Sequence, residues 1–172
     1  MDKQTLYVSD NFFSAGRTDI YNGSKEKVGE VDLRSMFTAG LDVLNMDEEI
    51  IVSGKFPFLS RRWVVTGPNG QEVGNLRAKF ALFSKRYEYS TENGRVFEIE
   101  SEAFSNLYIL YDENRNEAGR FEKISGFFSA AAFQLSSSDK GLDVYEMIAV
   151  VMGVNAIQKA ARNARNARNA AH

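Results

Sequence analysis

Apolar and polar residues alternate in short stretches along most of this chain. The clearest stretch places four apolar residues at every second position: Leu76, Ala78, Phe80 and Leu82. Arg77 and Lys79 fall between them and are predicted to point to the opposite side. A period of two residues is typical of antiparallel strands with one buried face, so we expect an inner apolar surface and an outer polar one.

An internal repeat organises these strands. A large apolar residue followed by serine or threonine recurs at intervals of 21 to 24 residues: Phe13-Ser14, Phe37-Thr38, Leu59-Ser60, Phe83-Ser84, Phe104-Ser105 and Phe128-Ser129. Polar turn sequences separate these pairs, among them Asn22-Gly23, Asn69-Gly70 and Asn93-Gly94. We interpret the Asn-Gly pairs as two-residue hairpin turns in which both residues have positive φ, and residues 45–49 and 112–116 as longer turns.

Each interval of the repeat then holds two strands. Short strands at residues 6–8 and 132–135 bring the total to roughly twelve. The sequence therefore predicts a mainly β fold, an antiparallel meander of hairpin repeats. A meander of this length closes into a barrel because closure removes exposed strand edges. Such a barrel is too wide for its inward side chains to fill, so another element must occupy its centre.

The apolar run from Val144 to Ile157 supplies that element. It is too short for a membrane span, which needs about 20 apolar residues, and Glu146 and Asn155 interrupt it. As a helix it is apolar all round, so it must be enclosed rather than packed on one side. The predicted core residues of this helix are Met147, Ile148, Val150, Val151, Met152, Val154 and Ile157. We expect one domain over residues 1–160, with Gly153 allowing a close approach to the wall, and an exposed basic, Ala-rich helical tail over residues 161–172.

These features together resemble the tubby C-terminal-like superfamily, and most of all its LURP-one-related proteins and bacterial YxjI-like members. The resemblance rests on the hairpin from Asn69 to Phe80, the repeated Phe-Ser corners and the apolar C-terminal helix. It implies a twelve-stranded barrel closed around a central helix. Tubby proteins bind phosphoinositide headgroups through basic side chains, and plant LURP-one-related proteins are linked to defence. No lipid-binding residue of the family can be matched to a position in this chain.

Composition excludes several kinds of chemistry. The chain has no cysteine, and its one histidine is the last residue, His172, so thiolate zinc sites, cysteine nucleophiles and histidine-dependent triads are excluded. We therefore expect no cofactor and no enzymatic activity. The N-terminus lacks the apolar segment of a signal peptide, so we expect a cytoplasmic protein, peripheral to a membrane if it binds lipid.

The distribution of charge gives the candidate site. The net charge is only −2, but from Lys55 to Tyr87 seven cations stand against the single acid Glu72, and from Glu88 the balance reverses. Basic residues beside aromatic ones are typical of peripheral anion and lipid sites. The candidate residues for an anionic ligand are Lys55, Arg61, Arg62, Trp63, Arg77, Lys79, Lys85 and Arg86. The alternatives are a solvated face paired with the acidic hairpins and, less favoured by the net charge, nucleic-acid binding.

Three functional hypotheses follow. The first is a non-enzymatic binding module for an anionic phospholipid or a phosphorylated ligand. The second is a protein-interaction or structural module in a stress or envelope pathway. The third is a hydrolase that uses carboxylates such as Glu98, Glu100 and Glu102, which alternate on one strand face. The arginines of the tail, Arg162, Arg165 and Arg168, either complement the helix dipole or bind an anionic membrane or partner.

A chain that ends at Asp143 is expected not to fold. Each large apolar side chain of the helix contributes about 1.5–3 kcal/mol on burial, and their sum exceeds the roughly 5–15 kcal/mol by which a domain is stable. Circular dichroism and thermal melting measure the outcome, with a chain ending at Ala160 as the folded control. A cooperative melt of the shorter chain would show that the barrel is stable without its helix.

Overall fold

A computed structural model describes residues 4–34, 40–79, 85–101 and 106–170 of the chain. Its described part contains twelve strands and one helix. The strands are β1 (Gln4–Ser9), β2 (Gly16–Tyr21), β3 (Lys27–Leu33), β4 (Gly40–Leu44), β5 (Ile50–Lys55), β6 (Trp63–Thr66), β7 (Glu72–Lys79), β8 (Arg86–Thr91), β9 (Val96–Ser101), β10 (Tyr108–Tyr111), β11 (Glu117–Ile124) and β12 (Ala132–Ser137). Helix α1 runs from Val144 to Ala170.

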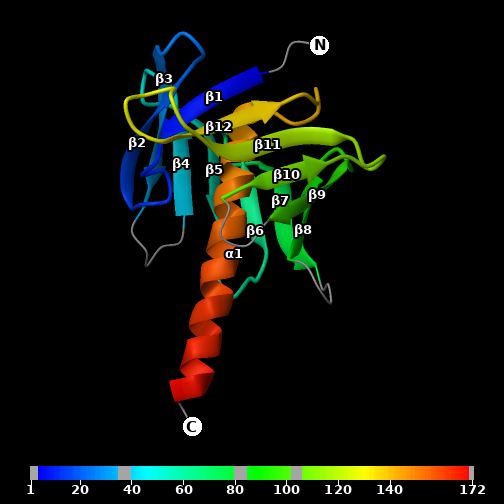
Figure 1. Ribbon diagram of the computed structural model, residues 1–172. Coiled ribbons are helices and arrows are strands. Elements are labelled where there is room, and N and C mark those ends of the chain that lie inside the picture. Colours follow the sequence, from blue (N-terminus) through cyan, green and yellow to red (C-terminus); the bar gives the residue numbers. More distant parts are fainter. Residues whose placement is uncertain (1–3, 35–39, 80–84, 102–105, 171–172) are drawn as a thin grey trace.

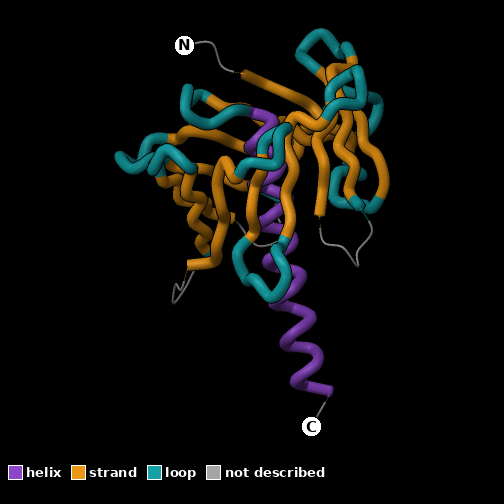
Figure 2. Tube along the Cα trace, turned by 180° about the vertical axis from the view of Figure 1, so that it is seen from behind, coloured by secondary structure: helices purple, strands orange, loops and turns teal. Residues whose placement is uncertain are grey.

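The strands form one closed antiparallel barrel around the helix (Figure 1). Each strand pairs with its neighbours in sequence, and β1 closes the circle by pairing with both β12 and β2. The predicted fold class and the central helix are therefore confirmed. Seen from behind, the helix leaves the barrel at one end and continues as a free rod (Figure 2).

The hairpin turns follow a common design that differs from the predicted one. Five turns span five residues each, and the fourth residue has positive φ: Lys25, Glu48, Gly70, Gly94 and Arg115. In the first, the Asn22 side chain accepts hydrogen bonds from the backbone N–H of Ser24 and Glu26, at 2.9 and 3.0 Å. Such side-chain caps favour a longer turn over the two-residue type. The prediction that both residues of each Asn-Gly pair have positive φ was therefore wrong.

The turns nevertheless confirm the repeat. Their positive-φ residues recur at intervals of 21 to 24 residues, which is the spacing of the Phe-Ser pairs. Among those pairs, residues 37–38, 83–84 and 104–105 lie outside the described residues. So do Phe80 and Leu82, which were predicted to face inward; Leu76 is fully buried as expected, whereas Ala78 is exposed.

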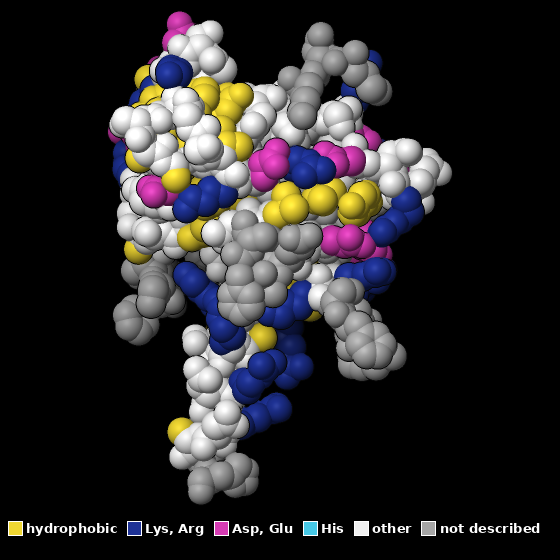
Figure 3. Space-filling view, in the orientation of Figure 1, with side chains coloured by type: hydrophobic (Ala, Val, Ile, Leu, Met, Phe, Trp, Pro, Cys, Tyr) yellow, Lys and Arg dark blue, Asp and Glu magenta, His cyan; other side chains and the backbone are white. Residues whose placement is uncertain are grey.

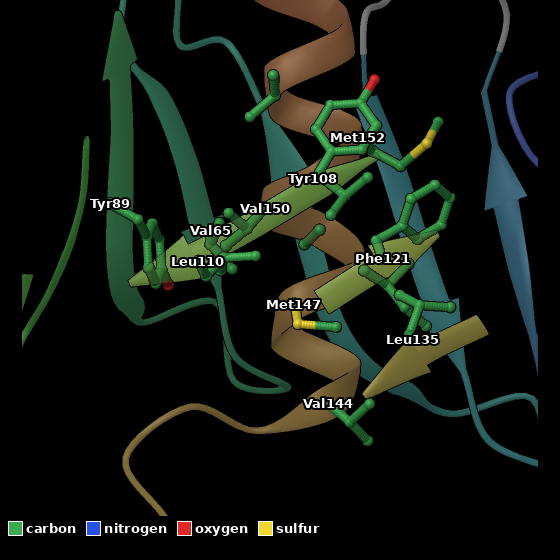
Figure 4. Packing of buried hydrophobic residues seen from close by; sticks show 14 of the residues in the cluster. Val65, Tyr89, Tyr108, Leu110, Phe121, Leu135, Val144, Met147, Val150 and Met152 are labelled. Carbon is green, nitrogen blue, oxygen red and sulfur yellow. The ribbon is translucent and has the colours of Figure 1, made fainter. Parts of the chain in front are cut away.

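The helix is enclosed as its all-round apolar surface requires. Met147, Val150 and Met152 face side chains from opposite walls of the barrel (Figure 4). Of the predicted core residues, Met147, Ile148, Val150, Val151, Met152 and Val154 are buried. Ile157 is half-buried, because it lies where the helix leaves the barrel. Residues 155–158 are all half-buried, and the helix is exposed from Lys159 onward.

One aromatic side chain fixes the helix against the wall. Trp63 at the start of β6 is 1% exposed, and its indole N–H donates to the Ala149 carbonyl at 3.1 Å. The ring lies between two glycines, one on β5 and one on α1. A Cβ at Gly54 would meet it at 2.6 Å, and a Cβ at Gly153 at 2.5 Å. Gly153 therefore allows the Trp63 ring of the wall to pack closely against the helix, as the sequence predicted.

The substitution Gly153→Ala is expected to destabilise the fold. The added methyl group displaces the Trp63 ring, at about 1–3 kcal/mol, while helix propensity returns up to about 1 kcal/mol. Chemical denaturation should show a net loss of about 1–2 kcal/mol, with a red shift in the fluorescence of this single tryptophan. Gly23→Ala is the matched control, because a Cβ there meets no atom within 4 Å and its φ is not positive. Equal stabilities for the two variants would contradict the role given to Gly153.

Candidate functional site at the open end of the barrel

The barrel end at which α1 leaves is called the open end. It is formed by the last residues of β3, β5 and β7 and the first residues of β4, β6 and β8 (Figure 1). Lysine and arginine side chains gather there and along the protruding helix (Figure 3). The predicted basic residues occupy this region, but they differ in how far acidic neighbours offset their charge.

Three of the predicted cations belong to an ion-pair network on the outer face of β7, β8 and β9. The Arg77 Nε donates to a Glu88 carboxylate oxygen at 3.1 Å, and the Lys79 ammonium lies 3.1 Å from the other oxygen. Arg86 pairs with Glu98 on β9 at 3.3 Å. The hydrogen bond from Arg77, together with Lys79, lowers the pKa of the Glu88 carboxyl. Much of this charge is thus balanced within the protein.

The remaining predicted residues lie around the β5–β6 connection and before β8. Trp63 is buried in the wall, so it offers no outer surface to a ligand. Arg62 lies 3.7 Å from Glu72. Lys55, Arg61 and Lys85 are exposed and make no ion pair with any residue that the structure describes. The three together form the uncompensated part of the predicted site.

An ordered turn between β5 and β6 presents two apolar side chains to solvent. The Ser60 N–H donates to the Pro57 carbonyl at 2.9 Å, and the Ser60 hydroxyl accepts from the Arg62 N–H at 3.0 Å. Phe58 and Leu59 occupy the tip, 93% and 89% exposed. Leu59 has φ of 58°, a left-handed conformation that glycine or asparagine normally occupies. The turn therefore exposes Leu59 in a strained backbone conformation, with Lys55 and Arg61 nearby in the chain.

The protruding tail adds further positive charge. From Lys159 to Ala170 the helix carries Lys159, Arg162, Arg165 and Arg168 and no acidic residue. All four are exposed, and none makes an ion pair with a described residue. At about 1.5 Å per residue, these twelve residues measure roughly 18 Å along the helix axis. The tail is thus a cationic rod next to the apolar turn.

A cavity of about 520 Å³ opens beside the helix at the same end. Strand ends, loops and one side of α1 form its wall: Phe13, Ser14, Ala15, Leu33, Arg34, Gly40, Phe56, Trp63, Met152, Asn155, Ala156, Lys159, Ala160 and Asn163. Apart from Trp63, the predicted site contained none of them. The sequence marked Phe13 and Ser14 only as a repeat pair and Met152 only as a core residue, because the cavity depends on where the helix leaves the barrel.

A half-buried carboxylate lies on the helix away from the open end. Glu146, in the first turn of α1, accepts a hydrogen bond from the Tyr89 hydroxyl, and burial raises the pKa of its carboxyl. Burial and the charge of Glu146 raise the pKa of Tyr89 as well. A Cβ at Gly74 would collide with the Tyr89 hydroxyl, so β7 closes over the pair. The hydrogen bond between Tyr89 and Glu146 thus connects strand β8 to helix α1.

Two further structural findings bear on the candidate functions. Within the described ranges, no group of three or more histidine, cysteine, aspartate or glutamate side chains is arranged to hold a metal ion. No helix in the described part of the chain is both long and apolar enough to cross a membrane.

Comparisons with known proteins support the fold. The structure resembles the X-ray structure of AT5G01750, a protein from Arabidopsis thaliana, with a TM-score of 0.60 and 10% sequence identity over 88% of each chain. The fold that the sequence resemblance implied, twelve strands closed around a central helix, is confirmed. At this identity the likeness shows the fold alone. No family model matches the sequence, and no curated protein matches it significantly.

The substitution Glu146→Gln is expected to stabilise the protein at neutral pH. The raised pKa means that folding disfavours the ionised carboxyl, so stability is lost as pH rises from the ordinary carboxyl range through the raised value. A neutral glutamine still accepts the Tyr89 hydrogen bond and avoids that loss. Melting temperatures should favour the variant at neutral pH and converge on acidification. The exposed Glu92→Gln is the control. A difference in melting temperature that stays constant across pH would contradict the raised pKa of Glu146.

Proposed function

We propose that this protein is a non-enzymatic binding module that docks on anionic membrane surfaces through the open end of its barrel. The observation that carries the proposal is the turn at Pro57–Ser60, which exposes Phe58 and Leu59 between uncompensated cations. Exposed apolar residues rimmed by polar ones are typical of interaction surfaces. A lipid interface suits this combination because it takes apolar side chains below the headgroups and cations among them.

The backbone at Leu59 supports a role beyond the fold. A leucine in the left-handed region costs about 1–2 kcal/mol relative to its preferred conformations. Its side chain is 89% exposed and recovers little of that cost by packing within the protein. Inserted at an interface, each large apolar side chain gains about 1.5–3 kcal/mol. The strain is thus offset only when a partner covers the turn.

The cationic tail supplies the attraction to anionic headgroups. Each lysine or arginine near such a surface contributes about 1 kcal/mol, whereas an arginine at the centre of a bilayer costs several kcal/mol. The arginines at positions 162, 165 and 168 therefore keep the tail in the headgroup layer. The resemblance to tubby proteins, which bind phosphoinositide headgroups, supports the same class of ligand.

Vesicle sedimentation tests the charge contribution. The double substitution Arg165→Gln and Arg168→Gln removes two cations from an exposed helix without lowering helix propensity much. Loss of about 2 kcal/mol predicts roughly 30-fold weaker binding to vesicles of phosphatidylcholine and phosphatidylserine. Wild-type binding should be weak on pure phosphatidylcholine and should fall with added salt.

The matched control for this pair is Lys25→Gln with Lys140→Gln. Both lysines are exposed and make no ion pair with a described residue. They lie in the turn after β2 and in the segment before α1, away from the tail (Figure 1). Equal losses for the two double variants would show that net charge, rather than the open end, governs binding. Capture of a stable protein partner without vesicle binding would favour the protein-interaction hypothesis instead.

The apolar turn is tested by Leu59→Asn. Asparagine accepts the left-handed conformation, so the melting temperature should stay equal or rise. Removal of the apolar side chain, worth about 1.5–3 kcal/mol at an interface, should weaken binding to anionic vesicles roughly 10- to 150-fold. Unchanged vesicle binding in this variant would rule out insertion of the turn.

A further inference from the structure

The cavity at the open end has a divided lining. Its inner wall is apolar, with half-buried Phe13, Leu33 and Phe56 beside Trp63 and Met152. The Phe56 ring meets the Trp63 indole edge to face, at 5.2 Å between ring centres. A volume of about 520 Å³ lies within the roughly 300–1,000 Å³ typical of pockets that bind small molecules. This inner wall suits a hydrocarbon chain.

The rim of the same cavity is cationic. Arg34 pairs with the Asp42 carboxylate, which also accepts a hydrogen bond from the Ser53 hydroxyl at 2.5 Å. Arg34 is therefore held in place with its charge largely balanced. Lys159 on the helix makes no ion pair with a described residue, and no acidic side chain is among the residues that line the cavity. The rim thus carries one uncompensated positive charge.

We infer that the cavity binds a fatty acid, with the acyl chain against Trp63 and Met152 and the carboxylate at Lys159. The cavity offers one apolar recess and one lysine without an ion pair to a described residue. A ligand with a single acyl chain and a single carboxylate fits this arrangement. This inference rests on the proposed function in one respect, the source of the ligand. When the open end docks on a membrane, free fatty acids in that membrane can enter the cavity. Asn155 and Asn163 beside Lys159 can donate further hydrogen bonds to the carboxylate.

The single tryptophan of the chain is a direct reporter of occupancy. Trp63 lines the cavity and is fixed by its hydrogen bond to Ala149, so a heavy atom on a bound chain lies against the indole. Palmitic acid brominated near the middle of its chain, kept below micelle-forming concentration and without vesicles, should quench Trp63 fluorescence saturably. Unlabelled fatty acids should compete, with affinity rising about fourfold for each added methylene until the cavity is full.

Two variants test the carboxylate contact and the apolar recess separately. Lys159→Gln should weaken binding of the acid about fivefold and leave binding of the corresponding fatty alcohol unchanged. Ala156→Phe places a ring in the cavity and should abolish quenching, and circular dichroism checks that the variant is folded. Should that variant not fold, Ala160→Phe, at an exposed lining position, takes its place.

The outcomes distinguish this inference from the proposed function. Arg165→Gln with Arg168→Gln should lose vesicle binding and keep quenching, while Ala156→Phe should lose quenching and keep binding to vesicles free of fatty acid. Absence of saturable quenching at every chain length would overturn the fatty-acid site and leave the membrane proposal intact. Equal affinities for acid and alcohol would overturn the assignment of the carboxylate to Lys159.

Discussion

The seating of Trp63 between two glycines is the contact on which the helix position depends. Gly54 in the wall and Gly153 in the helix leave room for the indole, and the Ala149 carbonyl satisfies its N–H. A buried aromatic ring with a satisfied polar atom contributes both apolar burial and a fixed orientation. Because the same ring lines the cavity, the contact that holds the helix also shapes the open end.

The barrel and its helix stabilise each other because neither has a complete core alone. Twelve strands enclose more space than their own side chains fill, and an all-round apolar helix is insoluble without an enclosure. The helix stays apolar only as far as the wall reaches: Val154 is fully buried, Ile157 half-buried and Lys159 exposed. The helix thus changes from apolar to basic residues at the point where it leaves the barrel, so its cations are exposed to solvent.

Ion pairing divides the cations of the chain into two groups with different consequences. On β7–β9, Arg77 lies opposite Glu88 in register and Lys79 reaches the same carboxylate from the next outward position, so the neighbouring strand balances both. Such exposed pairs contribute little to stability, but they leave little charge for a ligand. Near the apolar turn, Arg62 pairs with Glu72, whereas Lys55 and Arg61, like the cations of the tail, have no described acidic partner. The proposed membrane site and the fatty-acid cavity both belong to this second group.

The sequence by itself determined the strand count, the repeat, the closed barrel and the buried helix, because periods of two and of about 23 residues and an all-round apolar run are local signals. It also placed Arg77 and Lys79 outward. It did not determine the turn geometry, since Asn22 caps a five-residue turn through contacts that an Asn-Gly pair does not reveal. Nor did it predict the cavity or the packing of the Trp63 ring against Gly54. Those features arise where distant segments meet around the helix exit, and only the tertiary structure decides which residues meet there.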